Sequence, residues 1–97
     1  MDRTAIENAQ NFLILDGVEG QRRILDLECL LSVHEPYKVI DLMDELIRDS
    51  KAKLSRQIRR DKSDPRVDSS ISRIFRLKMA RNTISNAIDH AHPLESA

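Results

Sequence analysis

Hydrophobic residues recur every three or four positions along most of this chain, which is the period of one face of an α-helix. Pro36 suits the first turn of such a helix, and the pattern continues from there without a break to about Arg60. Its apolar positions follow in steps of three, four and seven residues: Ile40, Met43, Ile47, Leu54 and Ile58. We therefore expect one long helix with one face buried.

A second long helix is predicted after the short link Asp61–Asp64. It starts near Asp64-Pro65 or Ser69-Ser70 and ends before Pro93. The helical period is kept by a further set of apolar residues: Val67, Ile71, Ile74, Leu77, Ile84, Ile88 and Ala91. Because the link is so short, the two helices must form an antiparallel hairpin.

Pairing residues outward from the link predicts which side chains meet in this hairpin. Leu54 falls near Ile71, and Arg81 falls opposite Asp44 or Glu45. Three side chains of the interface are expected to be buried: Ile47, Leu54 and Ile71. Arg81 interrupts the apolar period, so we expect it to be partly buried and paired with one of the two carboxylates.

Two shorter helices are predicted before the hairpin. The first runs from about Ala5 to Leu15, and Gly17 is placed to end it. The second runs from Gln21 to about Val33. Alternation of apolar and polar residues is absent, so no strand is expected. The prediction is an all-α fold in which residues 1–97 form a single helical domain, a bundle of two shorter helices packed on a long antiparallel hairpin.

Composition adds an expectation about assembly and location. The chain has 97 residues, of which one is Tyr, two are Phe and none is Trp. A chain of this size buries roughly 60–65% of its unfolded surface, so association into a homodimer would add needed stability. Cys29 is the only cysteine and is expected to be buried as a small hydrophobe, which fits a reducing, cytoplasmic location. Neither a signal peptide nor a membrane-spanning run is visible.

Charge is divided along the sequence. Residues 1–50 contain eleven Asp and Glu against five Lys and Arg, whereas residues 51–97 contain eleven Lys and Arg against five Asp and Glu. The basic residues gather around the predicted link, where they would attract the phosphates of duplex RNA or DNA without reading sequence. Six cations are assigned to phosphate binding: Lys51, Arg56, Arg59, Arg60, Lys62 and Arg66.

Two other interpretations of the same charge stay open. The basic surface would look the same if it were only a solvated helix face. Most of its cations are Arg, which binds the carboxylates of a protein as well as phosphates. The alternative function is therefore a protein-binding regulator or chaperone-like adaptor, of the inhibitor or anti-activator type, whose helix faces hold an acidic protein partner.

Sequence motifs for catalysis and for cofactors are absent. No glycine-rich phosphate loop, zinc-protease motif or nucleophile elbow occurs, so we expect neither an enzyme nor a small-molecule substrate nor a cofactor. His90 and His92 are two residues apart on a helix and do not share a face, so they do not predict a metal site.

Overall fold

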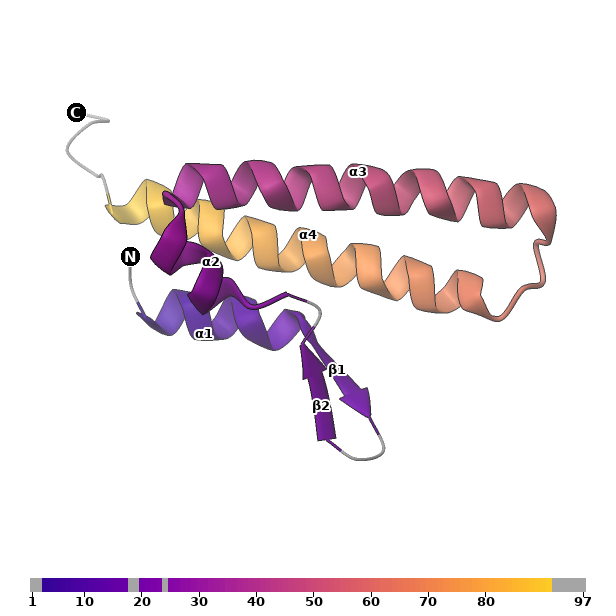
Figure 1. The fold of residues 1–97 in the computed structure, drawn as a ribbon, viewed down its shortest axis with the longest axis horizontal. Coiled ribbons are helices and arrows are strands. Elements are labelled where there is room, and N and C mark those ends of the chain that lie inside the picture. The colour runs from indigo at the N-terminus through magenta and orange to yellow at the C-terminus, as the bar shows by residue number, and fades with distance from the viewer. Residues whose placement is uncertain (1–2, 18–19, 24, 92–97) are drawn as a thin grey trace.

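The computed structural model describes residues 3–17, 20–23 and 25–91. Within them it contains four helices and one β-hairpin (Figure 1). In chain order the elements are α1 (Arg3–Phe12), β1 (Ile14–Gly17), β2 (Gly20–Arg23), α2 (Leu27–Val33), α3 (Pro36–Arg60) and α4 (Arg66–Ala91). The predicted four helices are confirmed, but the expectation that no strand forms is wrong, because β1 and β2 pair in a short hairpin.

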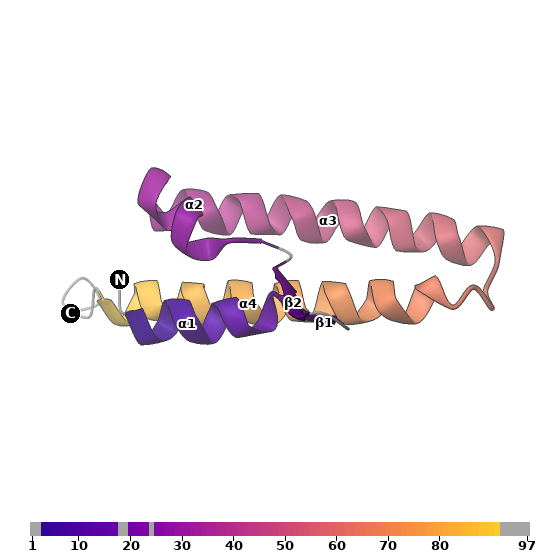
Figure 2. The ribbon, with the colours of Figure 1, turned by 60° about the horizontal axis from the view of Figure 1, so that its bottom comes forward.

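The two long helices lie side by side and antiparallel (Figure 1). α1 runs along α4, and α2 lies beside the start of α3, so both short helices sit at the end where α3 begins and α4 ends (Figure 2). We call this the covered end. The opposite end of the α3–α4 hairpin, with the turn between the two helices, extends beyond α1 and α2.

The hydrophobic core lies at the covered end. α1 contributes Ala9 and α4 contributes Ala80, two small residues that are fully buried at the end where α1 packs along α4. The largest fully buried side chains come from α2, α3 and α4 and from Leu13, which follows α1; Leu27 and Met43 are among them. Ile74, farther along the hairpin, is buried but does not belong to this cluster. Burial of apolar surface is therefore concentrated at one end of the molecule.

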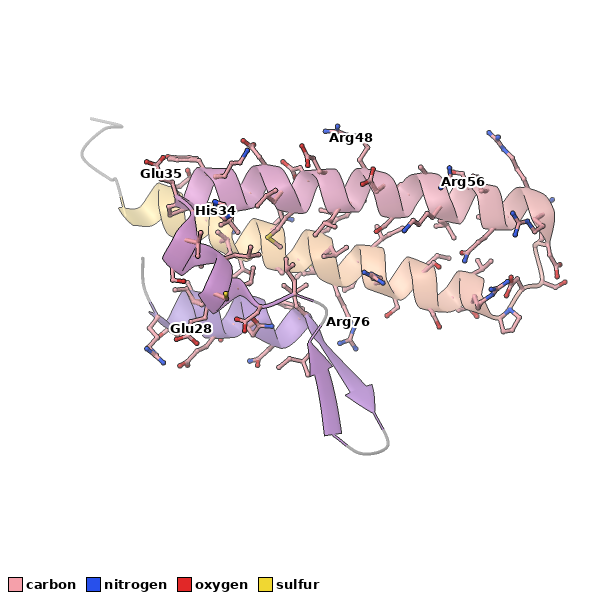
Figure 3. All side chains as sticks on the ribbon, viewed as in Figure 1. Glu28, His34, Glu35, Arg48, Arg56 and Arg76 are labelled. Carbon is pink, nitrogen blue, oxygen red and sulfur yellow. The ribbon has the colours of Figure 1, made fainter. Side chains whose placement is uncertain are left out.

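Two polar side chains fasten the remaining elements to this core. Gln10 of α1 is buried; its Nε2 donates to the carbonyl of Leu25 (2.8 Å) and its Oε1 accepts from the amide of Leu27 (2.9 Å). The guanidinium of Arg76 donates to the carbonyl of Ile14 (2.8 Å), which holds β1 against α4. Figure 3 shows Arg76 extending from α4 toward the β-hairpin.

The predicted start of the second helix at Gln21 is wrong. Residues 20–23 pair with residues 14–17 in an antiparallel ladder that joins Gly17 to Gly20. Two glycines three positions apart suit the turn of a β-hairpin, and this signal outweighs the helical pattern there. α2 starts at Leu27, where the carboxylate of Asp26 caps it by accepting from the amide of Cys29 (3.1 Å).

The register predicted for the long hairpin gives the expected ion pair. Arg81 Nε lies 3.0 Å from Asp44 Oδ1, and their side chains are 32% and 41% exposed. Ile47 is buried as expected, but Leu54 is only half-buried. Ile71 is 50% exposed, so its predicted burial is wrong.

The exposure of Ile71 follows from the positions on α4 that face α3. These are buried or half-buried and repeat in steps of three and four: Val67, Ser70, Ile74, Leu77, Arg81, Ile84 and Ile88. Ile71 follows Ser70 directly, and successive residues are about 100° apart around a helix. The side chain of Ile71 therefore turns away from the seam, while the smaller Ser70 enters it.

The predicted burial of Cys29 is also wrong, because its thiol is exposed. α2 presents Leu27, Leu30 and Leu31 to the core. Cys29 lies about 200° around the helix from Leu27 and so faces away from that surface. Within the described part of the chain, no helix is both long enough and apolar enough to cross a membrane.

Candidate functional site

The end of the α3–α4 hairpin that α1 and α2 leave uncovered carries a concentrated positive charge. Residues 51–73, which we call the basic end, contain eight Lys and Arg against three Asp. All eight cationic residues are exposed. Figure 3 shows Arg56 on this free part of α3. Positive charge that follows residue 50 in sequence is thus gathered at one end of the molecule.

The six cations assigned to phosphates do not share one surface. Arg56 and Arg60 are four residues apart and lie on the same side of α3. Lys51 lies on the other side of that helix, next to Lys78 of α4. Arg59 lies on the outer face of α3, away from the seam with α4, as its place in the helical period requires.

The remaining two assigned cations belong to the turn and its exit. Lys62 is exposed in the turn between the two long helices. Arg66 is the first residue of α4 and forms an ion pair with Asp64, with Nη2 2.8 Å from Oδ2 and Nε 3.1 Å from Oδ1. The Arg66 guanidinium holds the pKa of the Asp64 carboxyl below its usual value of 3.8. Arg66 is therefore already engaged within the chain.

Lys51 and Lys78 form a contact between like charges. Their side chains approach each other across the α3–α4 seam, and hydrogen bonding with Lys51, followed by the charge of Lys51, lowers the pKa of Lys78. Such a contact is unfavourable unless an anion lies nearby.

A groove runs between α3 and α4 on the side that carries Arg56 and Arg60. Its volume is about 280 Å³, and seven residues line it: Leu46, Asp49, Ser50, Lys53, Gln57, Ser70 and Arg73. Lys53 comes from α3 and Arg73 from α4, so the groove has one cation on each wall. Lys53 is three residues from Arg56 and seven from Arg60, which places the three on one stripe. Together with Arg73 they form a surface of four cations, here called the groove cations.

The groove exists because polar side chains occupy the seam where apolar ones would close it. Ser50, Gln57 and Ser70 lie at seam positions and are half-buried. The Ser70 hydroxyl donates to Gln57 Oε1 at 2.9 Å, so these side chains satisfy each other across the interface. The Ser50 hydroxyl and the Gln57 amide nitrogen do not take part in this bond, and such groups donate readily to phosphate oxygens. The floor of the groove is therefore suited to an oxyanion.

The groove cations are free of ion pairs. Among the described side chains, no carboxylate lies within salt-bridge distance of Lys53, Arg56, Arg60 or Arg73. Asp49 lines the groove at the end toward the covered core and does not pair with them. Lys53, Arg56 and Arg73 can therefore bind an external anion without first breaking an ion pair, whereas Arg60 also interacts with the charge of Asp64.

Lys53 and Arg73 are not among the six cations that the sequence analysis assigns to phosphates. The helical period already puts Lys53, Arg56 and Arg60 on one side of α3. The register that pairs Arg81 with Asp44 also sets Lys53 opposite Arg73. These two signals together would have selected the groove cations.

A second cavity, also of about 280 Å³, lies beside α1 and α2. It is lined by Arg3, Ile6, Glu7, Gln10, Asn11, Ile14 and Glu28. Arg3 forms ion pairs there with Glu7 (3.5 Å) and Glu28 (3.7 Å). Its single cation is thus matched by two carboxylates, which disfavours an anionic ligand.

No metal-binding cluster is present in the described part of the chain, where no three His, Cys, Asp or Glu side chains come together. The side chains of His90 and His92 lie outside the described residues. Comparison with protein-family models, with curated proteins and with solved structures finds no match to this chain.

Proposed function

We propose that this chain is a non-enzymatic nucleic-acid-binding protein that holds the phosphates of duplex RNA or DNA on the groove cations. The observation that supports this most is the groove between α3 and α4, in which unpaired cations face each other above hydroxyl and amide groups. Neutral polar groups and Arg or Lys are the side chains that most often contact nucleic-acid backbones.

A duplex is favoured over a single strand by the kinds of side chain on this surface. Proteins that hold single strands stack bases on aromatic rings. No aromatic residue lines the groove, and Phe75 lies on a different side of α4 from Arg73. Contacts to phosphates alone suit a ligand whose bases are already stacked and paired.

The test is a binding titration with a mixed-sequence 20-base-pair duplex, as RNA and as DNA, followed by fluorescence anisotropy. We expect affinity to depend little on sequence and to fall steeply with salt, with a log–log slope of about −0.9 for each phosphate neutralised. Lys53→Glu should weaken binding at least tenfold and make the slope shallower by about one. The single strand of the same sequence should bind more weakly than the duplex.

The matched control is Lys38→Glu. Lys38 is exposed on the same helix but lies near the covered end, and its reversal changes the net charge equally. If Lys38→Glu weakens binding as much as Lys53→Glu does, net charge and not the groove governs binding. If the wild-type chain does not bind either duplex at low salt and tens of micromolar protein, the proposal is wrong.

A protein-binding regulator or adaptor remains the second candidate, because two large apolar side chains of α4 are exposed. Ile71 is 50% exposed and Phe75 is 60% exposed. Exposed apolar side chains that lie together mark contact with another protein more often than contact with nucleic acid. This candidate predicts retention of an acidic protein partner and no shift of either duplex.

A further inference from the structure

The side of the α3–α4 hairpin away from the groove carries a regular stripe of exposed residues on α3. These residues are seven positions apart and so share one side of the helix: Tyr37, Asp44, Lys51 and Ile58. Tyr37 is 60% exposed and Ile58 is 37% exposed, and Asp44 and Lys51 also reach solvent. Read along the helix, the stripe is apolar, acidic, basic and apolar.

α4 places a second stripe beside the first. Ile71, Phe75 and Lys78 are four and three residues apart and share one side of α4. The contact of Lys78 with Lys51 and the ion pair of Arg81 with Asp44 show that this side of α4 adjoins the α3 stripe. The two stripes together form what we call the open side of the hairpin, which α1 and α2 do not cover.

The open side of one copy is complementary to the open side of a second copy that runs in the opposite direction. If a second α3 lies antiparallel, with the two-fold axis between residues 44 and 51, Tyr37 meets Ile58 of the other copy. Asp44 then meets Lys51 of the other copy, and each contact occurs twice. We propose that two copies of this chain associate antiparallel through their open sides.

This arrangement relieves two unfavourable features of the single chain. Asp44 keeps 41% of its side chain exposed after pairing with Arg81, so its carboxylate has room for a second cation. Placed beside the other copy's Lys51 and Lys78, it offsets the repulsion between these two ammonium groups. The exposed ring of Phe75 and the exposed side chain of Ile71 are covered by the opposite end of the other copy.

The reverse orientation does not give this match. In a parallel pair Lys51 would face Lys51 and Asp44 would face Asp44, which places like charges opposite each other at both charged positions of the stripe. The order of acidic and basic residues along the stripe therefore favours a second copy of this chain as the partner, and favours the antiparallel orientation.

The open side is large enough for a stable contact. Tyr37 and Ile58 are 21 residues apart on α3, which is about 32 Å along a helix. Two helices packed about 10 Å apart make the face roughly 20 Å wide, so about 600 Å² of each copy is covered. The total of about 1,200 Å² lies at the lower end of specific protein interfaces. The groove cations lie on the other side and stay accessible in such a dimer.

Sedimentation of the full chain without nucleic acid tests the proposal. We expect a mass near twice 11.2 kDa at several hundred micromolar. Lys51→Glu places an added carboxylate opposite Asp44 and should raise the dissociation constant at least tenfold. Lys38→Glu, an equal change of charge on the outer face of the same helix, should leave it unchanged.

Cross-linking tests the orientation. In a Cys29→Ser chain, Tyr37→Cys combined with Ile58→Cys should form a disulfide between copies under mild oxidation, whereas Tyr37→Cys alone should not. A bond within one chain is excluded by the distance of about 32 Å.

A mass of 11.2 kDa at several hundred micromolar overturns the proposal, as does an unchanged dimer in Lys51→Glu. Equal cross-linking by Tyr37→Cys alone shows a parallel pair and also overturns it.

Discussion

Arg81 shows how far a single residue can be predicted from its place in a pattern. A charged residue at an otherwise apolar seam position needs a partner, and the short turn between the long helices fixes which residues face it. The structure confirms the pair with Asp44, at 3.0 Å. Both side chains remain about one-third or more exposed, so water screens the attraction and the pair contributes only about 0.2–1 kcal/mol.

A double-mutant cycle measures this contribution. Asp44→Ala, Arg81→Ala and the double variant should give a coupling free energy of about 0.2–1 kcal/mol by urea denaturation at low micromolar concentration. The control cycle joins Arg81→Ala to Glu45→Ala, because Glu45 was the other candidate and no ion pair to it is present among the described side chains. Equal coupling in the two cycles would contradict the pairing.

Asp64 gives the turn between the long helices a dependence on pH. The hydrogen bonds and charge of Arg66 lower the pKa of Asp64 from 3.8 in the folded chain. The stabilisation is therefore complete above pH 3.8 and disappears as the pH falls through the lowered value. Asp64→Asn should lower the thermal midpoint at pH 6, and this deficit should become smaller as the pH falls from 3.8 toward about 2. A deficit that is the same at both pH values would show that the carboxylate charge does not matter.

At the scale of elements, α4 explains why helical period predicted the helix but not all of its buried residues. α4 packs against α3 on one side and against α1 on another, so apolar and small residues are spread around it. Ile71 fits the apolar period of the sequence, yet Ser70 occupies the seam position. Which of several possible faces is buried depends on where the other helices lie, and the sequence of α4 alone does not contain that.

Two isoleucines of α4 test this assignment of faces. Ile84 is fully buried, so Ile84→Ala should cost about 2–5 kcal/mol through lost burial and the cavity left behind. Ile71→Ala removes the same atoms from a half-exposed position and should cost less than about 1 kcal/mol at low micromolar concentration. The free energy of unfolding from urea denaturation measures both. A larger loss at Ile71 would mean that α4 is rotated.

The β-hairpin was missed for a related reason. Its strands have four residues each and no run of β-branched or aromatic side chains, so strand propensity is weak. Residues 19–23 contain no apolar side chain that could show a strand period, and only Gly17 and Gly20 indicate a turn. Gly17 and Gly20 favour a hairpin here, and this preference outweighs the helical period of the segments before and after it.

At the scale of the whole molecule, the division of charge along the sequence becomes a division in space. The hairpin carries residues 51–73 away from α1 and α2, so the basic end projects along a molecule 50 Å long. That much could be predicted from the charge pattern and the short turn. The helical period also separates Lys51 from Arg56 and Arg60. Which of these two sides borders the groove could not be predicted, because it depends on how α3 is rotated about its axis relative to α4.

The uneven core also determines how this molecule moves. At the covered end α3 and α4 are held by fully buried side chains such as Met43 and Leu77, whereas at the basic end the seam includes Gln57 and Ser70. Separating the helices at the basic end breaks few apolar contacts, so local opening costs much less free energy than unfolding the chain. The walls of the groove can therefore change their spacing while the core stays intact, and a bound ligand would reduce that motion.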